Sequence, residues 1–89
     1  MNNKILLESM ALDLKRVAIG AHRKSTKMSE RFLQEVIKRN EQLDYQSLPI
    51  SLKKLLLHMN KSFENKNSLQ LADNALMYST LLLSFSKRI

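Results

Sequence analysis

The chain of 89 residues contains a single glycine, Gly20, and a single proline, Pro49. These two residue types are the strongest interrupters of helices, so a chain almost free of them favours long helical segments. Hydrophobic residues make up 44% of the sequence, which is typical of a globular domain and not of a disordered chain. There is no cysteine, which excludes a disulfide framework and a thiolate metal site. The sequence therefore predicts one small all-α domain over residues 1–89.

Apolar residues recur at steps of three and four in four segments, which short polar breaks separate. They predict helices over residues 3–22, 26–43, 49–63 and 68–87. Because short links between helices favour antiparallel neighbours, we expect an antiparallel up-down four-helix bundle, as a monomer or as a dimer.

Segment 68–87 is the most apolar part of the chain. Its expected buried face combines small and large residues, namely Ala72, Ala75, Leu76, Ser79, Leu82, Leu83 and Ser86. The small residues would let another helix approach closely. The wide apolar arc indicates a helix that is central in the bundle or shared with a second subunit.

Two further sets of apolar residues are spaced by seven and extend beyond the faces that the bundle needs. They are Ile5, Leu12 and Ile19 in the first predicted helix and Leu71, Tyr78 and Phe85 in the last. The first set lies nearly opposite the main apolar stripe of its helix, and the second set widens the apolar face on one flank. A helix with two apolar stripes needs two partners, which are either another chain or a further element of the same bundle. These six residues are therefore candidates for self-association.

Acidic and histidine side chains show no pattern that indicates catalysis or metal binding. The eight carboxylates are scattered and are expected to be mostly solvated: Glu8, Asp13, Glu30, Glu35, Glu41, Asp44, Glu64 and Asp73. Neither His22 nor His58 has a second histidine or a carboxylate three or four residues away, as a helical metal site would need. One glycine is also too few for a phosphate-binding loop. We therefore expect no enzyme activity, no catalytic residue, no metal and no cofactor.

Positive charge is the remaining signal, since the net charge is +7. No acidic residue lies between Asp13 and Glu30, whereas six basic residues do, at the end of the first predicted helix and in the following turn: Lys15, Arg16, His22, Arg23, Lys24 and Lys27. This basic patch is a candidate site for phosphates or nucleic acid, and the alternative is a solvated basic edge. Stacking on unpaired bases is poorly supported, because all three phenylalanines lie on expected core faces.

The apolar run 75–85 would span about 16 Å as a helix, which is too short for a membrane core of about 30 Å, so we expect a cytoplasmic protein without a membrane span. The sequence favours a non-enzymatic interaction or assembly module that binds itself, as a homodimer, or another protein. The alternative is an accessory protein that binds nucleic acid through the basic patch. A third reading is a bacterial immunity-type protein at the inner membrane face, by analogy of size and charge alone.

Overall fold

The computed structural model describes residues 2–64 and 68–88, and within them it is all-helical. The elements are α1 (Asn3–His22), α2 (Thr26–Gln42), the short 3-10 helix η1 (Tyr45–Ser47), α3 (Ile50–Ser62) and α4 (Ser68–Ser86). The four α-helices begin and end within one residue of the ranges expected from the sequence. The all-α class is thereby confirmed, and the contacts between the helices are those of a bundle.

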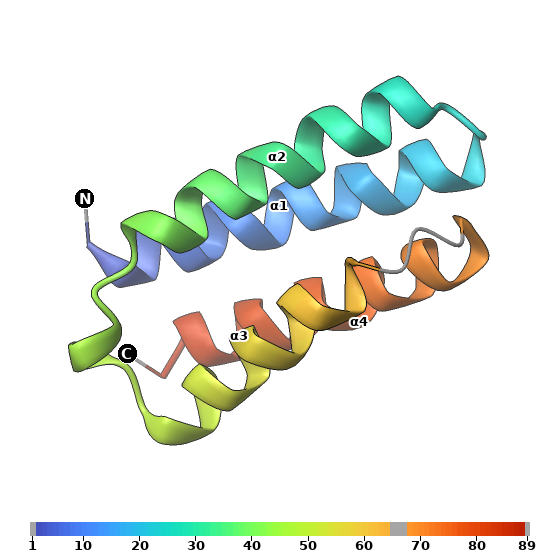
Figure 1. Ribbon diagram of the computed structural model, residues 1–89. Helices are drawn as coiled ribbons and strands as arrows, with labels where there is room; N and C mark the ends of the chain where they lie inside the picture. The colour runs from blue at the N-terminus through green and yellow to red at the C-terminus, as the bar shows by residue number, and fades with distance from the viewer. Residues whose placement is uncertain (1, 65–67, 89) are drawn as a thin grey trace.

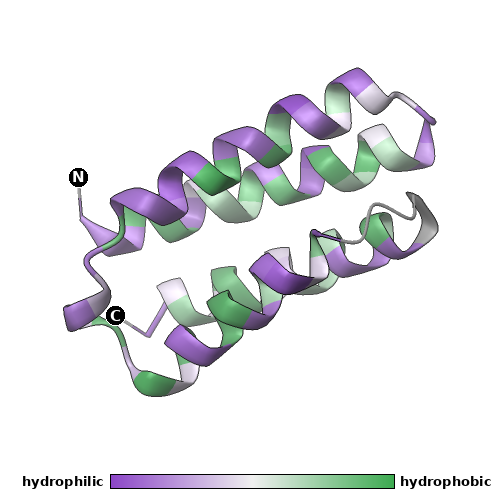
Figure 2. Cartoon of the chain, in the orientation of Figure 1, coloured by the Kyte–Doolittle hydropathy of each residue, from purple (hydrophilic) through white to green (hydrophobic). Residues whose placement is uncertain are grey.

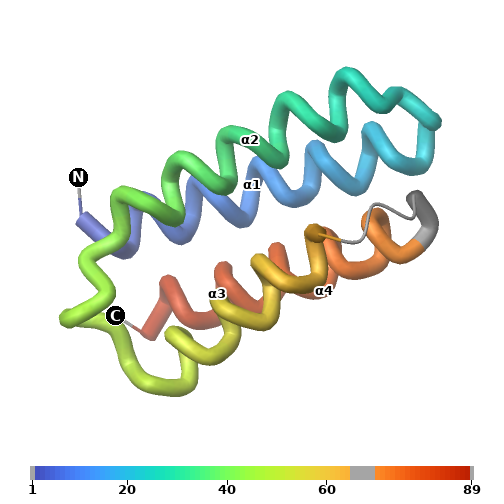
Figure 3. The backbone as a smooth tube through the Cα atoms, viewed as in Figure 1, coloured from blue at the N-terminus to red at the C-terminus, as the bar shows by residue number. Residues whose placement is uncertain are grey.

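The helix α1 packs along both α2 and α4, whereas α3 makes fewer close approaches, mainly to α4. Figure 1 shows α1 and α2 side by side in one half of the molecule and α3 and α4 in the other half. The molecule is elongated, with extents of 36 × 21 × 20 Å, and both ends of the described chain lie at the same end of the long axis (Figure 3). The first helix, and not the most apolar one, is thus the helix that two neighbours cover along its length.

The helices α1 and α2 form an antiparallel hairpin with a three-residue turn. The backbone N–H groups of Lys24 and Ser25 donate to the carbonyls of Ala21 and Gly20 at 3.1 and 2.8 Å, and Lys24 has a positive φ of 56°. This is the Schellman arrangement, in which the left-handed residue ends a helix by satisfying its last carbonyls. Ser25 then caps α2 by accepting from the N–H of Met28, so the turn closes one helix and opens the next.

Gly20 lies where the start of α2 touches α1. A Cβ atom at this position would be 2.8 Å from Ser29 Oγ and 2.9 Å from Ser29 N. The Ser29 hydroxyl donates to the carbonyl of Val17 at 3.2 Å, which joins the two helices at the same place. At the other end of the hairpin, Asn3 exchanges two hydrogen bonds with the backbone of Asp44, at 2.9 and 3.0 Å. These end contacts fix the register of the hairpin.

All four α-helices contribute to one hydrophobic core. Its largest fully buried side chains are Leu6, Leu7, Met10 and Leu14 of α1, Leu52, Leu56 and Met59 of α3, and Leu82 of α4. In Figure 2, α2 is coloured mostly as hydrophilic, with short hydrophobic stretches, whereas hydrophobic residues fill more of α3 and α4. Over the described residues, no helix has the length and hydropathy that crossing a bilayer requires.

The expected buried face of α4 was wrong at Leu76. This side chain is 44% exposed, whereas Tyr78, expected on the flank, is 5% exposed. Tyr78 packs edge-on against Phe63, just beyond the end of α3, with ring centroids 5.9 Å apart. The contact with α3 therefore rotates the buried face of α4 towards Tyr78 and away from Leu76.

Candidate functional site

The first candidate surface is an apolar stripe on the outer face of α1, which we name the α1 stripe. It consists of Ile5, Leu12 and Ile19, whose side chains are 45%, 55% and 44% exposed. The sides of α1 that face α2 and α4 are occupied, because nine residues there are buried: Leu6, Leu7, Met10, Ala11, Asp13, Leu14, Val17, Ala18 and Gly20. The stripe is thus the one side of α1 that no described element covers.

The other candidate set for self-association, Leu71, Tyr78 and Phe85 of α4, is buried or half-buried within the molecule. Tyr78 is buried, and its hydroxyl is 3.1 Å from the Ser62 hydroxyl. Leu71 and Phe85 are half-buried and pack against the core, and the Arg88 guanidinium lies over the Phe85 ring at 5.6 Å. The two sets spaced by seven therefore differ, since the α4 set serves the fold of a single chain while the α1 stripe remains exposed.

All six residues of the basic patch are exposed. Arg16 differs from the rest, because its guanidinium bonds to Asp13 at 3.0 Å and lies 5.2 Å from the centre of the Phe32 ring. His22, Arg23 and Lys24 follow one another at the end of α1, and Lys27 stands in the first turn of α2. The structure thus gathers these four at one end of the α1–α2 hairpin, and places Lys15 and Arg16 further along α1.

Asp13 is the one buried carboxylate of the described residues, at 4% exposed, whereas the other seven are exposed or half-exposed, as expected. Arg16 bonds to one of its oxygens, and Arg39 of α2 donates to the other. Arg39 also lies 4.0 Å from Glu35. Asp13 therefore links α1 to α2 within the hairpin. The sequence signal was present, since Leu6, Asp13 and Gly20 are spaced by seven and all three are buried.

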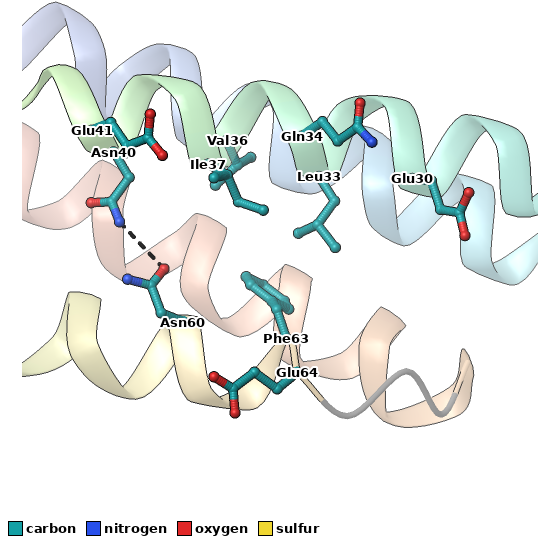
Figure 4. A pocket seen from close by; sticks show the side chains of 10 residues that line it. All are labelled: Glu30, Leu33, Gln34, Val36, Ile37, Asn40, Glu41, Asn60, Phe63 and Glu64. Atoms are coloured by element: carbon teal, nitrogen blue, oxygen red, sulfur yellow. Dashed lines mark hydrogen bonds between the residues drawn. The ribbon is translucent and has the colours of Figure 1, made fainter.

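The third candidate surface is an open groove between α2 and α3, with a volume of about 550 Å³, which we name the α2–α3 groove. The sequence carries no signal for this groove, because the groove depends on how α2 and α3 lie relative to each other. Figure 4 shows its ten lining residues, which are Glu30, Leu33, Gln34, Val36, Ile37, Asn40 and Glu41 from α2 and Asn60, Phe63 and Glu64 from α3 and its end. Leu33 and Phe63 point towards each other across the groove (Figure 4).

One end of the groove is closed by amide side chains. Asn40 donates to the side-chain oxygen of Asn60 at 3.3 Å, drawn as the dashed line in Figure 4, and accepts a hydrogen bond from the Tyr45 hydroxyl. Burial raises the pKa of Tyr45. The Asn40–Asn60 bond therefore holds α2 and α3 together at this end.

Among the described residues, no three histidine or acidic side chains lie close enough together to hold a metal ion. Comparison of the chain with protein-family models, with curated proteins and with solved structures gives no match.

Proposed function

We propose that this protein is a non-enzymatic assembly module in which two copies pair through the α1 stripe. The observation that carries the proposal is the regular exposure of Ile5, Leu12 and Ile19 on a helix whose other sides are covered. Spacing by seven keeps such a stripe on one side of a helix over several turns, as helix pairing requires. The up-down order of the whole bundle and the cytoplasmic location expected from the sequence are parts of the same proposal.

An antiparallel pairing about a twofold axis fits the charges beside the stripe. With Leu12 at the axis, Ile5 of one copy meets Ile19 of the other. Glu8 and Lys15 lie on the same flank of the stripe, about 40° and 60° from Leu12 at 100° per residue. Glu8 is four residues before Leu12 and Lys15 three residues after it, so they lie at similar distances on opposite sides of the axis. Each Glu8 would therefore lie beside Lys15 of the second copy. Neither residue has an ion-pair partner within the described part of the chain.

Analytical ultracentrifugation over a range of protein concentrations tests the pairing. Three half-exposed side chains form a smaller contact than a standard interface of about 1,600 Å², so the dimer should dissociate on dilution. Leu12→Lys should give monomer at every concentration, because it places two ammonium groups together at the axis.

The matched control is Leu57→Lys, since Leu57 is 60% exposed on α3 and lies outside the α1 stripe. This variant should associate like the unmodified protein. A monomeric unmodified protein, or a Leu12→Lys variant that still dimerises, would refute the proposal.

A second candidate function is nucleic-acid binding, favoured by the basic side chains that the hairpin turn gathers at one end of the molecule. Affinity for a labelled DNA duplex should then fall with rising salt. A plot of the logarithm of the binding constant against the logarithm of the salt concentration should have a slope of about −0.9 for each phosphate contacted. Changing Arg23, Lys24 and Lys27 together to glutamine should weaken this binding, whereas changing Lys53 and Lys54 of α3 should have a smaller effect. Failure to bind at low salt would rule this candidate out.

A further inference from the structure

The α2–α3 groove carries acidic residues in a protein that is otherwise strongly basic. Three of the eight acidic residues of the chain line it, and none of its ten lining residues is basic. Glu30 and Glu41 stand at the two ends of the α2 wall, and Glu64 stands on the opposite wall (Figure 4). Within the described residues none of the three forms an ion pair. The groove is therefore a local site of negative charge on a molecule of net charge +7.

Apolar side chains lie between these carboxylates. Leu33, Val36 and Phe63 belong to the hydrophobic core and form the floor of the groove, and Ile37 is 45% exposed at its edge. Figure 4 shows these side chains between the acidic ones, with the amides of Asn40 and Asn60 at one end. An apolar floor within a charged margin is the arrangement by which grooves accept amphipathic helices.

The length of the groove suits a helix of about three turns. Glu30 and Glu41 are eleven residues apart on α2, which corresponds to about 16 Å along the helix axis. The groove is held at the Asn40–Asn60 end by a side-chain hydrogen bond. An incoming segment would thus lie along α2 with its apolar face on Leu33, Ile37 and Phe63.

We propose that the α2–α3 groove binds a basic amphipathic helical segment of another protein. Apolar residues of that segment at i, i+3, i+4 and i+7 would contact the floor, and its lysine or arginine residues would face Glu30, Glu41 and Glu64. Charge complementarity selects this occupant, because an acidic segment would be repelled by all three carboxylates. The groove contains no residue of α1, so this inference stands apart from the proposed pairing through the α1 stripe.

The test uses the full-length protein and a synthetic peptide of about four helical turns, with leucines on one face and lysines on both flanks. Titration calorimetry should show binding, and NMR shift changes should concentrate on the groove residues. A peptide in which glutamate replaces each lysine should bind at least about tenfold more weakly, since each charge pair at an exposed margin has a modest effect and several add up.

Single charge reversals localise the binding. Glu41→Lys should lower the affinity for the basic peptide several-fold. Combining it with Glu30→Lys and Glu64→Lys should lower this affinity at least about tenfold. Asp73→Lys is the matched control, because it makes the same charge change at an exposed position of α4 outside the groove. This control should leave the affinity within about twofold.

A matched pair also tests the apolar contact. Ile37 and Leu76 are equally exposed, at 45% and 44%, but Leu76 lies on α4, away from the groove. Ile37→Ser should weaken peptide binding clearly more than Leu76→Ser.

Three results would overturn the proposal. They are equal binding of the basic and acidic peptides, shift changes centred outside the groove, and no binding of the basic peptide by a protein that circular dichroism shows to be folded. A fourth result would also overturn it. If the variant with the three groove charges reversed forms a smaller assembly than the unmodified protein does, the groove binds a second copy of this chain. Leu12→Lys should leave peptide binding intact, which separates this inference from failure of the dimer.

Discussion

Gly20 matters for the contact that it allows and not for backbone freedom, because it lies inside α1 with an ordinary negative φ. Its missing side chain lets the backbone of Ser29 approach. A glycine inside a helix lowers stability by about 1 kcal/mol relative to alanine, so the close approach offsets an intrinsic disadvantage. The two helices are thus joined where the chain has its only glycine.

Gly20→Ala is therefore expected to destabilise the protein, although alanine is the better helix former. The added methyl would meet the Ser29 backbone nitrogen at 2.9 Å, and the helix would have to shift. Overpacking of this kind typically lowers the free energy of unfolding by about 1–3 kcal/mol. Urea denaturation followed by circular dichroism measures the change. An increase in the free energy of unfolding would contradict the close approach of α2.

Asp13 is a buried carboxylate on a helix whose other acidic residue, Glu8, is half-exposed. Its carboxylate forms ion pairs with Arg16 of its own helix and with Arg39 of α2. Breaking a buried ion pair is far more damaging than breaking an exposed one, because an unpaired charge remains in a poorly solvated place. The ion pair between Asp13 and Arg39 also helps to fix which side of α1 faces α2.

Among the helices, α1 combines three differently occupied sides. One side faces α2, one packs on α4, and the α1 stripe faces outwards. Apolar residues are therefore found on several sides of α1 and not in a single buried stripe. This is the reason to assign pairing to α1 and not to α4, whose residues spaced by seven, Leu71, Tyr78 and Phe85, pack within the chain.

Charge exchange on α1 tests the direction of the proposed pairing. Glu8→Lys should weaken self-association, because it places like charges beside Lys15 of the second copy. Adding Lys15→Glu should restore it, since the exchanged pair is again of opposite sign. Sedimentation equilibrium of both single variants and the double variant gives the interaction free energy between Glu8 and Lys15 of the second copy. If the double variant associates no better than the single variants, the antiparallel arrangement is wrong.

On the scale of the complete fold, α1 approaches α2 and α4 more closely along its length than α3 approaches any helix. The helix α3 is held by its core residues Leu52, Leu56 and Met59 and by the contact of Phe63 with Tyr78. Its side towards α2 opens into the groove. The fewer close backbone approaches of α3 and the presence of a groove beside it are therefore related features of the fold.

Hydrogen exchange should show this difference between helices. Amides in the middle of α1 are expected to exchange most slowly, because two helices cover them along their length. Amides of α3 should exchange faster, since fewer packed neighbours must move to open that helix. Exchange measured residue by residue by NMR checks the order. Protection of α3 equal to that of α1 would contradict it.

Apolar spacing alone determined the all-α class and the position of each helix, because the period of a helix is a local property of the chain. It also placed Ile5, Leu12 and Ile19 on a separate side of α1, where the structure leaves them exposed. The tertiary structure decided what spacing leaves open, namely that Tyr78 is buried in place of Leu76 and that Asp13 lies between two helices. It alone formed the α2–α3 groove. The reason is physical: a period says which residues share a side of a helix, but the neighbour on that side depends on how far and at what angle the other helices approach.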